Sequence, residues 1–341
     1  MYGLEVAHYV TDELSRHNAQ HVTKADIEAA SAYILDAIRS ANNAIMENPV
    51  SKPIIEDDID KRSIIITSFD DHFGELIVRE DPLTGTKETT YNYSIARKRM
   101  QERFDRAFTE IEIRGRDNFD EIIIAIGGDN VDGDGSVYPT QEHFIEPNGY
   151  IWTQMMQYSD ALVDNAERAA AFLGEDKRVR IIGVAGNHGN SKVKRGNHPV
   201  KHNWDTGCYD MIQNRLYCKH RPPEYDRITI SYSRDIDVKS FKAKGWTYTM
   251  IHAMTKNMGA PTFAKKLLGI KELYNPDVVL TGHYHESGLV NLGTTSVYRI
   301  GTSAGPNDYS DKLMIKSSGP EQSLFIVSAK YKVEAYIPIE L

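Results

Sequence analysis

Five short segments of this chain are rich in histidine, aspartate and asparagine side chains that could bind metal ions. Four of them directly follow a run of apolar, often β-branched residues, and the fifth, a lone histidine, follows residues 247–251 in the same manner. Residues placed in this way lie at strand ends, where an open α/β sheet has its ligand crevice. In chain order, the segments are Asp70-Asp71-His72-Phe73-Gly74, Gly128-Asp129-Asn130-Val131-Asp132, Gly186-Asn187-His188, His252 and Gly282-His283-Tyr284-His285.

These residue types suit the hydrolysis of a phosphate ester by two metal ions. Two divalent cations about 3.5–4 Å apart can hold a hydroxide between them and polarise the phosphoryl oxygens that it attacks. One carboxylate must bridge both ions, and neutral imidazoles can fill the outer positions without adding charge that repels a phosphate. Calcium prefers oxygen ligands alone, whereas mixed histidine and carboxylate ligands favour transition ions. We therefore expect two divalent transition-metal ions, with manganese preferred and iron, zinc or nickel as alternatives.

Over about residues 62–290, the order and spacing of these segments resemble the calcineurin-like metallophosphoesterases, whose motifs are D-x-H, G-D-x-x-D, G-N-H, H and G-H-x-H. The resemblance implies that His188 faces the phosphate, where it stabilises the transition state or protonates the leaving oxygen. It also implies that Asp132 supports catalysis by holding a metal ligand or the His188 loop. The implied metal ligands are Asp70, His72 and His285 for the first ion, Asn187, His252 and His283 for the second, and Asp129 as the bridge.

The chain departs from the family pattern at two glycines. Gly189 follows the G-N-H motif, where the family commonly has an acidic residue that orients the phosphate-facing histidine. Gly133 follows the second motif, where the protein Ser/Thr phosphatases of the superfamily carry arginine, and no arginine directly precedes Gly186. The resemblance therefore disfavours a phosphoprotein phosphatase. It also disfavours a purple acid phosphatase, which has a metal-bound tyrosine at the position of Asp132.

The composition is that of a globular protein, and the length suits one large α/β domain with appendages or one domain plus a small one. The chain has 341 residues, of which 40% are hydrophobic and 26% are charged. Its apolar runs stay well short of the roughly 18 residues that a membrane span needs, and its start lacks a basic and apolar signal pattern. We therefore expect no membrane association and a cytoplasmic location. The two cysteines, Cys208 and Cys218, are too few for a disulfide framework.

Positive charge is concentrated after His188, although the formal net charge of the chain is −8. Residues 192–221 contain seven Lys or Arg and two Asp, which gives 7 − 2 = +5. Such a segment could grip the phosphates that flank a scissile one, or it could be a solvated loop. Trp204 and Tyr209 could stack a base or anchor the loop in the core. The predicted substrate-binding residues are Lys192, Lys194, Arg195 and Lys201.

Helical and strand patterns alternate along the chain, and its last part is all strand. Met155 and Met156 are expected in the core. The alternation predicts an α/β sandwich of two sheets flanked by helices, and the resemblance implies the four-layer α/β/β/α fold of the family. The predicted helices cover residues 93–112, 150–173, 209–217 and 261–274. The predicted strands cover residues 62–68, 121–126, 178–184, 247–252, 277–281, 288–291, 296–300, 323–328 and 332–338.

Residues 1–55 are predicted to form a helical N-terminal extension outside the catalytic domain. Thr23 and Asp26 suggest a capping box, apolar residues then recur near helical spacing, and Pro49 ends the pattern. The extension could read DNA, join copies of the chain into a homo-oligomer or cover a sheet edge, and assembly or covering is preferred. The calcineurin-like domain is expected over residues 56–341, with a basic insert at about 189–225.

Three functions fit the sequence. The first is a two-metal phosphodiesterase that acts on nucleic acid, with DNA preferred. Turn-rich residues 301–310 and 317–322, together with the variant G-N-H-G motif and the basic residues after it, look similar to metallophosphoesterases often encoded by phages, which are frequently labelled DNA repair exonucleases. The second function is a small-molecule phosphatase or cyclic nucleotide phosphodiesterase. The third is a non-catalytic module that binds partners, which would be expected to lose ligands, whereas all seven are present here.

Overall fold

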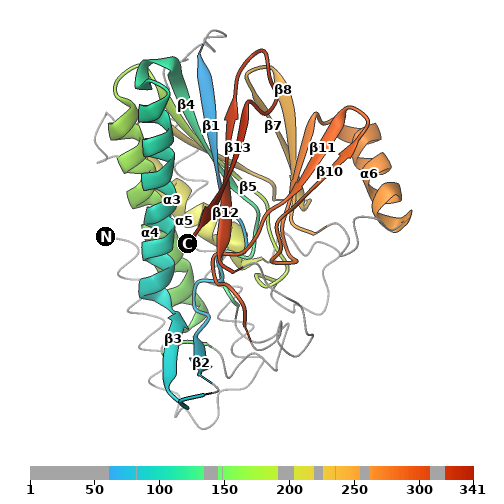
Figure 1. Ribbon diagram of the computed structural model, residues 1–341. Helices are drawn as coiled ribbons and strands as arrows, with labels where there is room; N and C mark the ends of the chain where they lie inside the picture. Colours follow the sequence, from blue (N-terminus) through green and yellow to red (C-terminus); the bar gives the residue numbers. More distant parts are fainter. Residues whose placement is uncertain are drawn as a thin grey trace.

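The computed structural model describes residues 61–81, 83–133, 145–147, 149–190, 203–218, 226–234, 236–253, 261–307 and 319–341. Two β-sheets face each other, with helices on both outer sides (Figure 1). The predicted helical extension, residues 1–55, and much of the basic insert lie outside the described residues. None of the helices in the described ranges combines the length and apolar character that a membrane crossing needs.

The larger sheet has six strands in the order β13-β12-β1-β4-β5-β6. Strands β1, β4, β5 and β6 run parallel, β12 is antiparallel to β1, and the edge strand β13 is antiparallel to β12. The central strands are nearly continuous apolar runs because both of their faces are covered. The bounds are β1 Arg62–Ser68, β4 Phe119–Ile126, β5 Arg178–Gly183, β6 Ile228–Tyr232, β12 Glu321–Val327 and β13 Ala335–Glu340.

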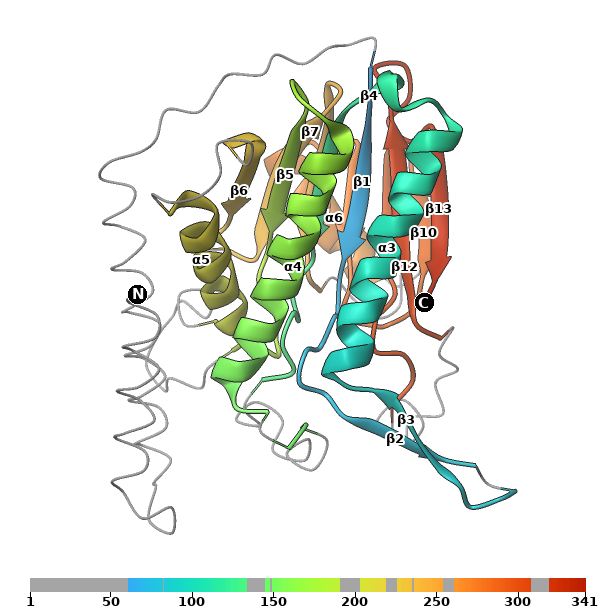
Figure 2. The same cartoon turned by 90° about the vertical axis from the view of Figure 1, so that its left-hand side faces the viewer.

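The smaller sheet has five strands in the order β10-β11-β9-β8-β7. Strands β8, β9 and β11 run parallel, and β7 and β10 are antiparallel strands at the two edges. A separate hairpin, β2 and β3, projects from the body (Figure 2). The bounds are β7 Val238–Ala243, β8 Trp246–Ile251, β9 Val278–Thr281, β10 Gly288–Leu292, β11 Thr295–Arg299, β2 Ile77–Glu80 and β3 Lys87–Tyr91.

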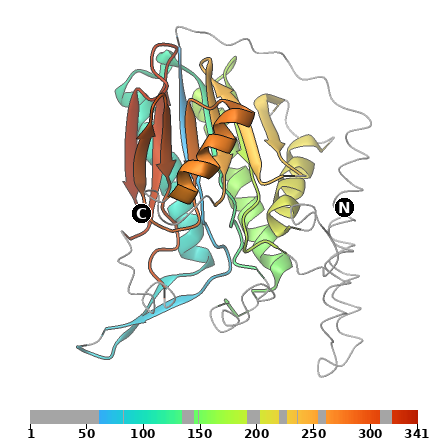
Figure 3. The same ribbon diagram turned by 90° about the vertical axis from the view of Figure 1, so that its right-hand side faces the viewer.

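Helices cover the outer face of each sheet and complete the layers. Helices α3, α4 and α5 lie on the larger sheet (Figure 2), and α6 lies on the smaller sheet (Figure 3). Three separate apolar cores fill the spaces between the four layers. The predicted four-layer α/β/β/α architecture is therefore confirmed. The bounds are α3 Tyr93–Ile113, α4 Ile151–Leu173, α5 Trp204–Tyr217, α6 Pro261–Tyr274 and a short 3-10 helix, η1, Arg116–Asn118.

The elements predicted within the catalytic domain are present with small shifts at their ends. Four strands were not predicted, namely β2 and β3 of the hairpin and β6 and β7. Both β6 and β7 are sheet edges in which polar and apolar residues are mixed, so neither contains the apolar run that marks a central strand. The hydrophobic pattern of these two edge strands is therefore too weak to predict them from the sequence.

Three residue predictions are corrected or sharpened by the packing of α4 and α5. Trp204 and Tyr209 are fully buried, so they anchor α5 in the core and cannot stack a base. The Tyr209 hydroxyl donates to the Val184 carbonyl at 2.6 Å. Met155 is buried as predicted, whereas the core prediction for Met156 is wrong because its side chain is 39% exposed. Successive residues of a helix point in different directions, so only one of this pair faces the sheet.

The turn after β4 requires glycine at position 128. Gly128 has a φ of 87°, and a Cβ there would lie 2.3 Å from the backbone nitrogen of Gly186. We expect Gly128→Ala to lower the free energy of unfolding by about 2–5 kcal/mol, because left-handed strain and a clash with backbone add together. Urea denaturation measures this loss. Gly293→Ala is the matched control, because its φ is 61° but nothing lies within 4 Å of the added Cβ. Equal losses in the two variants would contradict the packing argument.

Candidate metal centre

The five segments meet at one edge of the two sheets because the strands that precede them are parallel within each sheet. Strands β1, β4 and β5 of the larger sheet and β8 and β9 of the smaller sheet each end shortly before one segment. Backbone hydrogen bonds join neighbouring segments: Asp70 N donates to Gly128 O at 3.1 Å, and Gly282 N donates to His252 O at 2.9 Å. The fold thus brings the segments together at the carboxyl ends of strands, as the sequence predicts.

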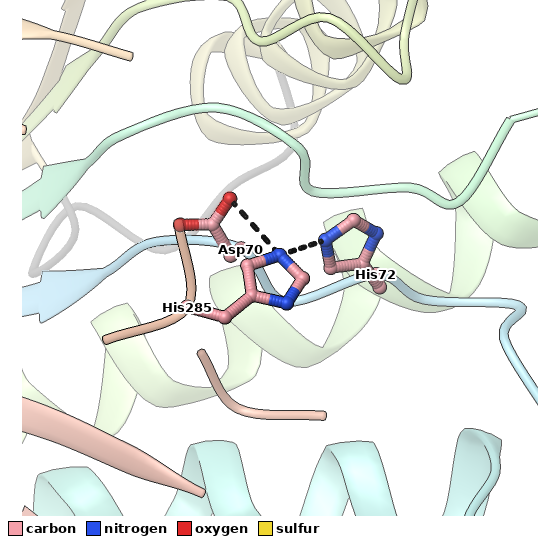
Figure 4. Close-up of side chains that lie close together, drawn as sticks. All are labelled: Asp70, His72 and His285. Atoms are coloured by element: carbon pink, nitrogen blue, oxygen red, sulfur yellow. Dashed lines mark hydrogen bonds and ion pairs between the residues drawn. The ribbon is translucent and has the colours of Figure 1, made fainter. Parts of the chain in front are cut away.

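Asp70, His72 and His285 form the first of two ligand clusters. Figure 4 shows the His285 ring between the other two side chains, with its Nε2 atom 3.1 Å from His72 Nε2 and 3.7 Å from Asp70 Oδ1. Asp70 Oδ1 is buried and has no hydrogen-bond partner in the described part of the chain. A buried, unpaired carboxylate oxygen is costly unless a cation compensates it. The three side chains therefore fit a metal ion held by one oxygen and two nitrogens.

Asp129, His252, His283 and Asn187 form the second cluster. His252 Nε2 lies 2.9 Å from Asp129 Oδ2 and 2.8 Å from Asn187 Oδ1. Candidate ligand atoms of Asp129, His252 and His283 lie within 4.8 Å of one another, and those of Asp129 and His72 also lie within this distance. Asp129 therefore stands between the two clusters, where one carboxylate could contact both ions.

Hydrogen bonds on the far side of the rings orient two of the histidines. His252 Nδ1 lies 2.9 Å from Gly127 O, so it donates its hydrogen to the carbonyl and directs the Nε2 atom at the cluster. His72 Nδ1 lies 3.3 Å from Asp132 Oδ1 and is held in a similar way. Carbonyl and carboxylate partners of this kind fix the tautomer of metal-binding histidines.

His188 lies beside both clusters and is held by Asp132. Its Nδ1 atom is 3.0 Å from the Asp132 carbonyl oxygen and 3.3 Å from Asp132 Oδ1. Its backbone nitrogen donates to Asp129 Oδ1 at 2.7 Å, and its ring packs edge-on against His72 with 4.5 Å between centroids. The structure thus places Asp132 in contact with His72 and His188, while Gly189 contributes no side chain to this role.

Many of the candidate ligands have a left-handed backbone that residues other than glycine rarely adopt. Each such conformation typically costs about 1–3 kcal/mol, persists only where the surroundings impose it, and is concentrated at functional sites. A side-chain contact helps to hold one of them, because His283 N donates to Asp70 Oδ2 at 2.8 Å. The φ values are 51° for Asp70, 44° for His72, 52° for Asp129, 77° for His283 and 56° for His285.

Burial and neighbouring charges shift the pKa values of the candidate ligands in different directions. Burial and then the charge of His252 lower the pKa of His283 to about 4, so its ring is neutral at pH 7 and suited to bind metal. Burial raises the pKa of Asp70 to about 7, even though His252 acts in the opposite direction. Burial lowers the pKa of His252, but the Asp129 carboxylate outweighs it and raises that pKa to about 9. Cations must therefore compete with protons at Asp70 and His252.

The four predicted substrate-binding residues, Lys192, Lys194, Arg195 and Lys201, lie outside the described residues. The residues at the two ends of that stretch are described, and they pair with each other in an isolated antiparallel bridge, Asn190 with Asn203. Trp204 N also donates to Gly189 O at 2.6 Å. The described residues that flank positions 191–202, Asn190 and Asn203, thus lie close to His188 in the chain and in space.

One basic residue of the insert is already paired elsewhere. Arg215 on α5 contacts Asp160 and Asp164 of α4, with nitrogen–oxygen distances of 2.5 and 2.9 Å. Its charge is therefore compensated within the fold, so the +5 counted from the sequence overstates the charge that the insert can offer to a ligand.

Two buried aspartates that support the site were missed by the sequence reasoning. Asp71 lies behind the first cluster, where its Oδ1 atom is 2.9 Å from an Arg103 guanidinium nitrogen and accepts from the Ser303 hydroxyl at 2.5 Å. Asp205 lies behind the second cluster and accepts backbone N–H groups. Asp71 is part of a motif already singled out, but Asp205 looked like a countercharge in a basic run. No local pattern pointed to either contact, because the partners are distant in sequence.

Comparison with known families agrees with the geometry. Residues 97–287, more than half of the chain, match the model of the calcineurin-like phosphoesterase family. The chain therefore belongs to the calcineurin-like phosphoesterases, and this membership implies a hydrolase that acts on phosphoesters. The matched part contains the candidate ligands from Asp129 onward, whereas Asp70 and His72 precede it. The predicted family is confirmed, and the kinship with phage-type or DNA repair exonucleases remains a prediction.

Several solved structures are distantly similar to the chain. A novel archaeal phosphodiesterase is 14% identical with a TM-score of 0.33, covering 82% of this chain and 99% of its own. A hypothetical protein from Pyrococcus horikoshii is 10% identical with a TM-score of 0.38, covering 82% and 88%. Vps29 from Entamoeba histolytica, complexed with zinc, is 9% identical with a TM-score of 0.32, covering 81% and 89%. No curated protein sequence matches the chain significantly.

Metal binding should strengthen as the pH rises. Asp70, with its pKa raised to about 7, and His252, with its pKa raised to about 9, must lose protons before they can bind a cation. Below the pKa of each group, the apparent affinity for Mn²⁺ is expected to rise about tenfold per pH unit for each displaced proton. Calorimetry between pH 6 and pH 9, in buffers of different ionisation enthalpy, measures both the affinity and the protons released. An affinity independent of pH, with no proton release, would contradict the assignment.

Proposed function

We propose that the protein is a two-metal phosphodiesterase that cleaves DNA. The observation that carries this proposal is the pair of ligand clusters with Asp129 between them, because one carboxylate shared by two cations is the arrangement that two-metal hydrolysis needs. In the proposal, Asp129 bridges the ions. Asp70, His72 and His285 complete the first site, and Asn187, His252 and His283 complete the second.

His188 supplies the proton chemistry in this proposal. Burial lowers its pKa, but the Asp129 and Asp132 carboxylates outweigh burial and raise the pKa to about 10, so the ring is positively charged at neutral pH. Its Nδ1 hydrogen is directed at Asp132, and in the proposal the Nε2 side of the ring faces the phosphate. A charged imidazole there stabilises negative charge that develops on the phosphoryl group and can protonate the leaving oxygen. Bound divalent cations would supply the nucleophile and further charge neutralisation.

The basic insert supports a nucleic acid as the substrate. Lys192, Lys194, Arg195 and Lys201 lie in sequence between Asn190 and Asn203, which pair with each other next to the His188 loop. Cationic side chains near a cleavage site bind the phosphates that flank the scissile one and make the affinity dependent on salt. The substrate of a small-molecule phosphatase or cyclic nucleotide phosphodiesterase has no flanking phosphates for these side chains to bind. The complete ligand set disfavours a module that has lost catalysis.

Turnover assays on four substrates test the proposed reaction. The substrates are a chromogenic phosphodiester, a phosphomonoester, and labelled single- and double-stranded DNA, each with Mn²⁺ and after chelation. We expect metal-dependent cleavage of the diester and of DNA, and loss of both in Asp129→Asn. His188→Gln should bind metal normally but lower the rate by about 10²–10⁴-fold, since it removes acid–base assistance.

Each other result has a defined meaning. Activity on the small esters alone would favour the nucleotide phosphodiesterase, and no activity on any substrate would favour the binding module. A fully active His188→Gln protein would refute the role given to this histidine.

Neutralising the insert tests the substrate class. The triple substitution of Lys194, Arg195 and Lys201 by glutamine should weaken binding to single-stranded DNA. It should also reduce the slope of log affinity against log salt by up to about 2, since each lost phosphate contact contributes about 0.7. Turnover of the chromogenic diester should stay within about twofold. The control exchanges three exposed lysines on other elements, Lys98, Lys265 and Lys330, for glutamine. Identical salt slopes for the two triple variants would contradict a DNA-binding role of the insert.

A further inference from the structure

Asp205 joins the two loops that carry the ligands of the second cluster. It is the second residue of α5 and is fully buried. Its Oδ2 atom accepts from the backbone nitrogen of Gly186 at 2.7 Å and of Asp129 at 3.0 Å, and its Oδ1 atom accepts from Asn130 N at 3.0 Å. One carboxylate therefore holds the loop after β4 and the loop after β5 at a fixed separation.

The start of α5 fits against these loops without space for a further side chain. Asn203, the N-cap of α5, accepts from Asp205 N at 2.8 Å and donates to Gly186 O at 2.7 Å. A Cβ at Gly189 would lie 2.3 Å from Asn203 Oδ1 and 3.0 Å from Asp205 N. The glycine that departs from the family motif is thus the position against which α5 packs.

We propose that Asp205 is a positioning residue for the metal centre, which sets the distance between the bridging Asp129 and the Asn187-His188 loop. The inference rests on the proposed two-metal function. Three N–H donors converge on the carboxylate, and an asparagine in its place could offer only one acceptor oxygen. Its amide nitrogen would face at least one of these donors, so the two loops would separate and the second ligand set would lose its spacing. The first set, Asp70, His72 and His285, comes from other strands and should be affected less.

A second buried aspartate on the same helix, Asp210, provides a control for the general loss of a buried carboxylate from α5. Asp210 is also fully buried in α5, but its carboxylate accepts from the Tyr232 hydroxyl and pairs with Arg234. Asp210→Asn removes a buried carboxylate of the same type, whose partners Tyr232 and Arg234 belong to β6 and the residues that follow it. It is the matched control for Asp205→Asn.

Titration of the full-length protein with Mn²⁺ alone, followed by calorimetry and electron paramagnetic resonance, tests the proposal. Wild-type protein and Asp210→Asn should bind two ions and give an exchange-coupled signal. In Asp205→Asn, the site that we assign to the second ligand set should lose about 10- to 100-fold in affinity, as expected for a residue that orients ligands, and the coupled signal should be lost at two equivalents. Gly189→Ala, which pushes Asn203 and Asp205 away from the loops, should have the same selective effect if Asp205→Asn does not fold.

The outcomes distinguish this inference from the proposed function. If wild-type protein does not bind two ions, the two-metal function itself is refuted. If wild-type protein binds two ions and both Asp205→Asn and Gly189→Ala bind them unchanged, only the positioning role is refuted. Equal loss at both sites, or an equal loss in Asp210→Asn, would also overturn the positioning role, because a general weakening of α5 would then explain it.

Discussion

The structure depends on the burial of several ionisable side chains in a small volume where the two sheets meet. Asp70, Asp129, Asp132, His72 and His252 are all nearly inaccessible to water. Taking a charge out of water costs several kcal/mol unless an opposite charge or hydrogen bonds compensate it. Here the carboxylates face imidazole rings, and one oxygen, Asp70 Oδ1, faces no hydrogen-bond donor among the described residues. A site that buries several carboxylates and imidazoles together in this way is suited to hold cations.

Two buried aspartates make contacts behind the ligand loops. Asp71 meets Arg103 behind the first cluster, and Asp205 receives three backbone N–H groups behind the second. Parallel strands supply the common edge, but they do not by themselves set the positions of side chains beyond the strand ends. The left-handed backbone at Asp70 and Asp129 is consistent with loops whose conformation is imposed by such contacts. Support from outside the ligand set therefore matters as much as the ligands.

The sequence predicted the fold, and the meeting of the five segments at one sheet edge, because both leave local signals. A continuous apolar run such as β1 or β4 identifies a central strand, and the polar segment after it identifies the loop at its carboxyl end. Edge strands such as β6 lack that run and were missed. The contacts of Asp205 were missed because its partners are up to 76 residues away in sequence. The burial of Trp204 could not be read from its position in a basic segment, since burial depends on how α5 packs against α4.

The most direct test of the central claim is anomalous diffraction from crystals of the full-length protein grown with Mn²⁺. We expect two manganese peaks about 3.5–4 Å apart, with Asp129 in contact with both, His72 and His285 at one and His252 and His283 at the other. A single peak, or peaks that do not share Asp129, would contradict the two-metal centre.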